Sequence, residues 1–126
     1  MPLVRIDLHK GKDAAYRSKI GDVVYESLVT ATGVPQHDRF QIIAEHDPAN
    51  FLYDRTYLGI DRDDNFVVIQ ITLNTGRTLD QKKALYRAIA EGLHTALGLR
   101  MEDVFINLVE VPKENWSFGN GIAQYA

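Results

Sequence analysis

The sequence repeats itself at an offset of 65 residues, and no other feature constrains the fold as strongly. Gly33, Asp38, Phe40 and Glu45 recur at this offset as Gly98, Asp103, Phe105 and Glu110. Apolar positions follow it without a gap: Val4, Ile6 and Leu8 match Ile69, Ile71 and Leu73, and Ile20, Val24 and Leu28 match Leu85, Ile89 and Leu93. Because these matches fall in one register, the chain is predicted to contain two copies of one structural unit.

Each unit is predicted to open and close with a strand. Apolar and polar side chains alternate over residues 4–8 and 67–73, which is the period of half-buried strands. Residues 39–46 and 104–111 form the closing strands.

A helix is predicted between the two strands of each unit. Apolar residues recur on one helical stripe between Asp13 and Thr32. In the second unit, Thr78 and Gln81 form the capping-box pattern that begins a helix, and Gly98 stands where a helix ends. A helix that joins two short strands in this way forms a right-handed parallel β-α-β unit.

The predicted fold class is therefore α+β, in one domain over residues 1–126. Two β-α-β units, at about residues 2–46 and 65–111, form a four-stranded mixed sheet with both helices on one face. The other face has mixed polarity and carries Leu3, Arg5, Asp7, Val68, Gln70 and Thr72. We expect this face to meet other subunits in a closed oligomer, although a solvated face is the alternative.

Two segments are expected to lie outside the repeat. Residues 47–65 form a connector rich in aspartate, and residues 113–126 form a C-terminal tail that contains Trp116 and Phe118. Aromatic side chains bury large areas, so the tail is expected to pack against another surface.

Composition excludes several classes of function. The chain has a formal net charge of -3, no cysteine, and no apolar run long enough to span a bilayer. These features predict no nucleic-acid partner, no membrane partner and a cytoplasmic location. The four histidines lack the spacing of metal ligands, so no metal site is expected.

Pro2 is the first candidate for chemistry. Removal of Met1 is expected because the second residue is small, and it would leave Pro2 as an N-terminal secondary amine. A free α-amine titrates near ~8, and burial or nearby cations lower that value, so it can act as a base or an acid near neutral pH. The alternative is that Pro2 merely begins an exposed strand.

Arg77 and Asp38 are the next candidates. Arg77 lies where the third strand leads into the second helix, and a guanidinium beside free backbone N–H groups suits a carboxylate. Lys12 holds the equivalent place in the first unit. A solvated loop arginine is the alternative. Asp38 precedes the second strand as Asp103 precedes the fourth, so a structural role in both turns is the simpler interpretation.

Taken together, these residues resemble the tautomerase superfamily, and most closely its malonate semialdehyde decarboxylase group. The resemblance rests on the duplicated chain that begins Met1-Pro2, and on the segments 33–41, 75–82 and 116–119. It implies a homotrimer whose sheets enclose a central barrel, with active sites at subunit interfaces and with no metal or organic cofactor.

The resemblance also implies roles for individual residues. Pro2 would be the catalytic amine, Arg77 would hold the carboxylate of a small substrate, and Asp38 would assist proton transfer or orient a water. Trp116 and Phe118 would form the walls of the substrate pocket.

One departure from the decarboxylase pattern leaves the reaction open. That group carries two arginines separated by one residue, whereas this chain has Thr75 and Arg77. Two cations stabilise a leaving carboxylate or a developing enolate better than one. The first prediction is therefore a tautomerase of small 2-oxo acids or their enols, with Pro2 as general base or acid.

Three other readings stay open. One is a decarboxylase or hydratase of 3-oxo acids that uses protonated Pro2. Another is an imine mechanism on the same residue. The third is a pocket that binds without catalysis, since this fold also serves in signalling proteins.

Overall fold

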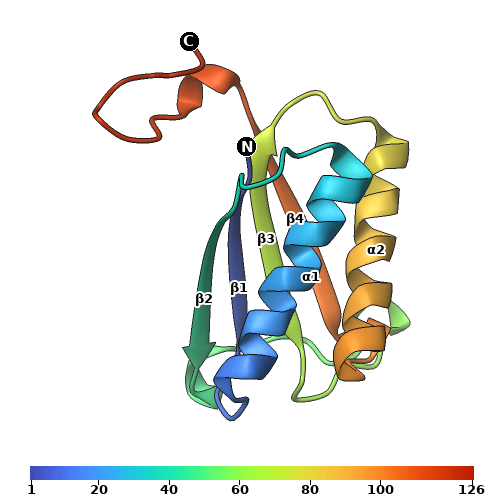
Figure 1. The fold of residues 1–126 in the computed structure, drawn as a ribbon. Coiled ribbons are helices and arrows are strands. Elements are labelled where there is room, and N and C mark those ends of the chain that lie inside the picture. The colour runs from blue at the N-terminus through green and yellow to red at the C-terminus, as the bar shows by residue number, and fades with distance from the viewer.

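The structure is a computed structural model that describes all of residues 1–126. The chain forms one four-stranded sheet with two long helices on one face (Figure 1). The strands and helices, in chain order, are β1 Leu3–His9, α1 Ala14–Thr32, β2 Phe40–His46, β3 Val67–Asn74, α2 Leu79–Leu97 and β4 Val104–Val111. Short 3₁₀ helices are η1 Pro48–Asn50, η2 Tyr57–Gly59, η3 Met101–Asp103 and η4 Lys113–Asn115. The predicted fold class is confirmed.

The sheet has the strand order β2-β1-β3-β4, which puts the first strands of the two units side by side. β1 pairs with β2 in parallel, and β3 pairs with β4 in parallel, as expected for two β-α-β units. β1 and β3 run antiparallel, with Leu3 opposite Thr72 and Leu8 opposite Val67. The start of β1 therefore lies beside the end of β3, and the start of β3 lies beside the end of β1.

Both helices begin and end on capping interactions that the sequence encodes. The Asp13 carboxylate accepts a hydrogen bond from the Tyr16 amide at 2.8 Å, and Thr78 forms a reciprocal capping box with Gln81. Each helix has 19 residues, and the two begin 65 positions apart. None of the helices combines the length and the apolar character needed to cross a bilayer.

The core lies between the helices and the sheet face that they cover. Its fully buried members are aliphatic side chains from β1, α1, β3 and α2, among them Val4, Ile6, Ile20, Leu28, Ile69, Ile71, Leu85 and Leu93. Burying one such side chain contributes about 1.5–3 kcal/mol, so this cluster drives folding. The helices approach closely at Gly92, where an added Cβ would stand 2.7 Å from a methyl carbon of Val23.

The opposite face of the sheet is open and partly apolar. Phe40 and Phe105 are 50% and 47% exposed, and Ile42 lies beside Phe40 on the same face of β2. Charged and polar residues such as Arg5 and Gln70 interrupt this surface. Several large exposed apolar side chains gathered on one sheet face are typical of an interaction surface.

The connector and the tail, which lie outside the two predicted units, also resemble each other at the 65-residue offset. η1 and η4 lie 65 residues apart, and both end in asparagine. The aromatic residues that follow keep the same offset, with Phe51 and Tyr53 corresponding to Trp116 and Phe118. The relation is hard to see in the sequence because the aromatic residues are of different types.

Asp38 and Asp103, which correspond in the repeat, have different surroundings. The structural role predicted for both fits Asp103 only. Asp103 is fully buried and accepts hydrogen bonds from the Arg100 guanidinium at 2.9 Å and from the Asp63 amide at 2.8 Å. Burial alone raises the pKa of Asp103, but the hydrogen bonds from Arg100 and Asp63 lower it, and the net pKa lies below the ordinary value. Asp38 has no such partners, since its Oδ1 is buried without a hydrogen bond.

We expect Asp103→Asn to lower the free energy of unfolding by about 2 kcal/mol, because it weakens the charge-assisted hydrogen bonds that the partly exposed Arg100 donates to a buried carboxylate. Asp38→Asn is the matched control, and its cost should be smaller by at least ~1 kcal/mol. Urea denaturation at equal chain concentration measures both.

The contribution of Asp103 to the free energy of unfolding also depends on pH. A carboxylate with a lowered folded-state pKa stabilises the protein above its unfolded pKa of ~4, and this stabilisation is lost as the pH falls through the folded pKa. The difference between wild type and Asp103→Asn should therefore shrink in acid. Equal costs for the two variants at neutral pH would contradict the assignment.

Candidate active site

A small cavity surrounds Pro2 at the start of β1. Its volume is about 210 Å³, and its walls are Met1, Pro2, Leu3, Phe40, Trp116, Ser117 and Phe118. Pro2 itself is buried. The rings of Trp116 and Phe118 stack with their centroids 5.5 Å apart, so the tail forms an aromatic wall.

The Asp38 carboxylate faces the beginning of the chain. The parallel register pairs Leu3 with Phe40, which brings the residues before β1 next to those before β2. The Met1 amine lies 3.6 Å from Asp38 Oδ2. Leaving a buried carboxylate oxygen without a partner costs free energy, and Asp38 Oδ1 is in that state. A donor at the start of the chain would relieve this cost.

A second cavity, of about 500 Å³, surrounds the turn between β3 and α2. It is lined by Asn74, Thr75, Gly76, Arg77, Gln81, Lys113 and Tyr125. Arg77 and Lys113 are its two cations. The Lys82 ammonium hydrogen-bonds Glu110 and holds the pKa of that carboxyl below its usual range, so this nearby anion already has a partner. The cavity is suited to an anion.

Asn74 links the two cavities. Its side-chain oxygen accepts a hydrogen bond from Trp116 Nε1 at 2.7 Å, and its carbonyl oxygen accepts one from the Arg77 guanidinium at 3.2 Å. Asn74 is buried at the end of β3. Asn74 was not among the residues expected at the site, because its only signal in the sequence is a polar residue that ends an apolar strand.

The structure brings the five expected site residues to one end of the sheet. Pro2, Trp116 and Phe118 share one cavity, Asp38 faces the adjoining chain start, and Arg77 lines the neighbouring cavity. No group of three or more His, Asp or Glu side chains is arranged to hold a metal ion. The arrangement combines a buried chain start, a carboxylate, aromatic walls and a cationic recess.

Two family models, both described as tautomerase enzyme, match this chain. One matches residues 38–119 and the other matches residues 2–60. A protein of Bacillus subtilis (strain 168), the probable tautomerase YusQ, is 44% identical over 124 residues, which are 98% of each chain.

Solved structures agree with this relationship. A malonate semialdehyde decarboxylase, FG41, inhibited by 3-bromopropiolate, superposes with a TM-score of 0.90 at 38% identity, over 98% of this chain and 93% of that one. A fused 4-OT that forms a symmetric trimer has a TM-score of 0.78 at 22% identity, over 98% of this chain and 97% of that one, and so shares the fold. Family models, a nearly full-length relative and the fold agree, and the chain belongs to the tautomerase family.

Proposed function

We propose that this protein is a cofactor-independent tautomerase of small 2-oxo acids or their enols, with the Pro2 amine as general base and acid. The observation that carries the proposal is the environment of the chain start. Pro2 lies in an aromatic cavity, and Asp38, whose Oδ2 lies 3.6 Å from the Met1 amine, has a buried Oδ1 that lacks a donor. The second cavity, which contains the cations Arg77 and Lys113, lies next to the Pro2 cavity.

The chemistry requires the free amine of Pro2. Within the chain Met1-Pro2, the Pro2 nitrogen is an amide and has no basicity. After removal of Met1 it becomes a secondary amine, whose ordinary pKa near ~8 is lowered by burial and raised by a nearby carboxylate. Asp38 then offers its unpartnered oxygen to the single N–H of the neutral amine, which orients the lone pair.

The proposed reaction moves one proton and needs no other reactant. The neutral Pro2 amine removes the proton from the enol hydroxyl, and the oxygen–carbon bond becomes a carbonyl as the carbon–carbon double bond gives up its electron pair. The resulting Pro2 ammonium donates a proton to the carbon that receives this pair. Arg77 pairs with the substrate carboxylate and holds the carbon near the amine.

A decarboxylase of 3-oxo acids is the second candidate, and Lys113 is the observation that favours it. Lys113 lines the same cavity as Arg77, so the recess has two cations although Thr75 replaces the expected first arginine. Protonated Pro2 would polarise the carbonyl oxygen while the carboxylate leaves as carbon dioxide. The likeness to a malonate semialdehyde decarboxylase supports this alternative.

A homotrimer fits the open sheet face. Phe40 and Phe105 lie half exposed on that face, and Phe40 also lines the Pro2 cavity. Contact between subunits through this face would bury these side chains and close the cavity. The trimer formed by a fused 4-OT of the same fold supports this assembly.

We expect Pro2→Ala to lower kcat/KM for phenylenolpyruvate by about 100-fold, which is the low end for loss of a proton-transfer group, because the variant keeps a primary amine. The matched control, Pro35→Ala, changes an exposed proline and should keep full activity. Mass spectrometry establishes whether each chain begins at residue 2. Full activity in Pro2→Ala, or in wild type that retains Met1, would refute the role of Pro2.

Arg77→Gln should raise KM by about 10- to 100-fold with a smaller change in kcat, since a charge-assisted contact contributes about 1.5–3 kcal/mol. Arg77→Lys should restore part of the loss. The exposed Arg87 on α2 supplies the control variant Arg87→Gln. Steady-state kinetics provides the readout, and an unchanged KM in Arg77→Gln would exclude a carboxylate contact.

The pH profile separates the two candidate reactions. For tautomerisation by neutral Pro2, kcat/KM should rise with pH through the pKa of the amine, whereas decarboxylation by protonated Pro2 should fall over the same range. Carbon dioxide released from malonate semialdehyde measures the second reaction directly. If it is formed, Lys113→Gln should slow it at least ~10-fold while tautomerisation changes less.

A further inference from the structure

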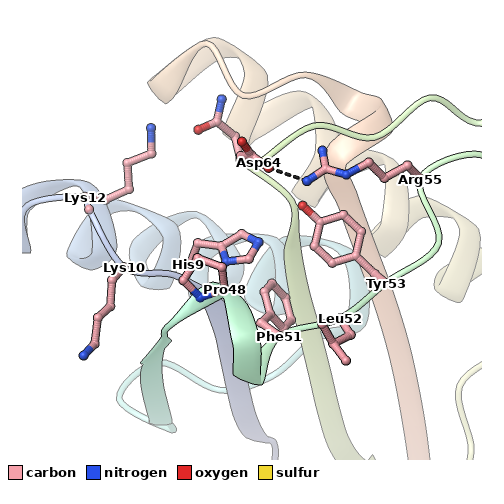
Figure 2. Close-up of a pocket in the computed structure, with 11 residues that line it drawn as sticks. His9, Lys10, Lys12, Pro48, Phe51, Leu52, Tyr53, Arg55 and Asp64 are labelled. Atoms are coloured by element: carbon pink, nitrogen blue, oxygen red, sulfur yellow. Dashed lines mark hydrogen bonds and ion pairs between the residues drawn. The ribbon is translucent and has the colours of Figure 1, made fainter.

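A third cavity lies at the opposite end of the sheet, where β1 ends and β3 begins. Its volume is about 540 Å³. Figure 2 shows the residues that line it. Five of the residues that line it correspond, at the 65-residue offset, to residues that line the Arg77 cavity: His9, Lys10, Gly11, Lys12 and Pro48 match Asn74, Thr75, Gly76, Arg77 and Lys113. The two cavities are therefore copies of one site, related by the repeat.

The two copies also share backbone geometry and aromatic walls. Gly11 and Gly76 adopt φ angles of 125° and 127°, a conformation that side chains disfavour, so the two turns have the same shape. Phe51 packs edge-on against His9 with centroids 5.0 Å apart, as Trp116 is bonded to Asn74 in the other copy.

The cations of this cavity are not equally available. Lys10 pairs with Asp47 at 3.2 Å. Arg55 pairs with Asp64, and Figure 2 shows this contact across the cavity from the lysines. Lys12 forms no ion pair with a carboxylate, and its ammonium lies 5.0 Å from the centre of the Tyr16 ring. The paired charges cancel, and Lys12 leaves one net positive charge.

His9 adds an unused hydrogen-bond group. Both of its ring nitrogens are buried and have no hydrogen-bond partner. Figure 2 shows the ring between Lys12 on one side and Tyr53 on the other. In either neutral tautomer one nitrogen carries a proton, so His9 can donate to an oxygen of an anion held by Lys12.

The catalytic features have no counterpart at this end. Val67 corresponds to Pro2, and its nitrogen is part of a peptide bond. Asp103 corresponds to Asp38, and its oxygens already bond Arg100 and the Asp63 amide. The copy therefore keeps the anion-holding turn and the aromatic walls without the proton-transferring groups.

We propose that this cavity binds a small carboxylate with an apolar or aromatic body, and does not convert it. Lys12 pairs with the carboxylate, His9 donates a hydrogen bond to it, and Phe51, Leu52 and Tyr53 contact the body. The inference rests on the proposed role of Arg77 in the other copy, so the experiment monitors both copies at once.

The test is a titration of the ¹⁵N-labelled full chain with phenylacetate, which has no keto group to tautomerise, followed by NMR. The Gly11 and Gly76 amides report on the two copies. We expect both to shift, with saturation by about 10 mM if Kd is in the millimolar range. Lys12→Gln should weaken the binding that the Gly11 amide reports at least ~10-fold, and should leave the binding reported by Gly76 and the catalytic rate unchanged. Arg77→Gln should weaken the binding reported by Gly76 and lower the catalytic efficiency, and should leave the binding reported by Gly11 unchanged.

Lys83→Gln, on the exposed side of α2, is the charge-matched control and should alter neither site. A Gly76 shift without a Gly11 shift overturns this inference alone, whereas absence of both also removes the proposed carboxylate contact of Arg77. A Gly11 shift that persists in Lys12→Gln, or tighter binding of inorganic phosphate than of phenylacetate at Gly11, also overturns it.

Discussion

The antiparallel pairing of β1 with β3 is the contact on which the rest of the structure depends. Each β-α-β unit alone would expose one edge of its first strand, and a two-stranded sheet with one helix has little core. Pairing Leu3 with Thr72 and Leu8 with Val67 joins the units into one sheet, and both helices pack against the same face of it. The same pairing puts the start of β1 beside the end of β3, and the start of β3 beside the end of β1.

The position of the candidate active site follows from that pairing. Asn74 ends β3 beside the beginning of β1, and from there it contacts both Trp116 and Arg77. The chain start, the aromatic tail and the cationic turn are far apart in the sequence. They converge because the sheet brings the ends of its two central strands together.

The strands and helices were predictable because their signals are local. Asp13 and Thr78 cap the two helices where the sequence predicted their beginnings, and the residues that end them are glycines in the left-handed region. Alternating apolar residues identified which face of each strand is buried. Strand order was not local information, but the repeat restricted it to arrangements with two equivalent halves.

Contacts between distant segments were less predictable. The residues expected at the site lie at one end of the sheet, but the bridge through Asn74 depends on tertiary geometry that no local pattern encodes. The relation between the connector (residues 47–65) and the tail (residues 113–126) was not apparent from the sequence, because Phe, Tyr and Trp can replace one another in aromatic stacking and edge contacts. The contrast between Asp38 and Asp103 depends on Arg100, whose counterpart in the first unit is Pro35.

The position of Val67 has a consequence for how an active site arises in a duplicated fold. A nitrogen inside the chain is a planar amide whose lone pair is delocalised, while the same nitrogen at a terminus is an amine. Two ends of the sheet thus share walls and charges, and differ in chain continuity. A circularly permuted chain that began at residue 67 would exchange which end carries the basic nitrogen, with no change in the packing of the core.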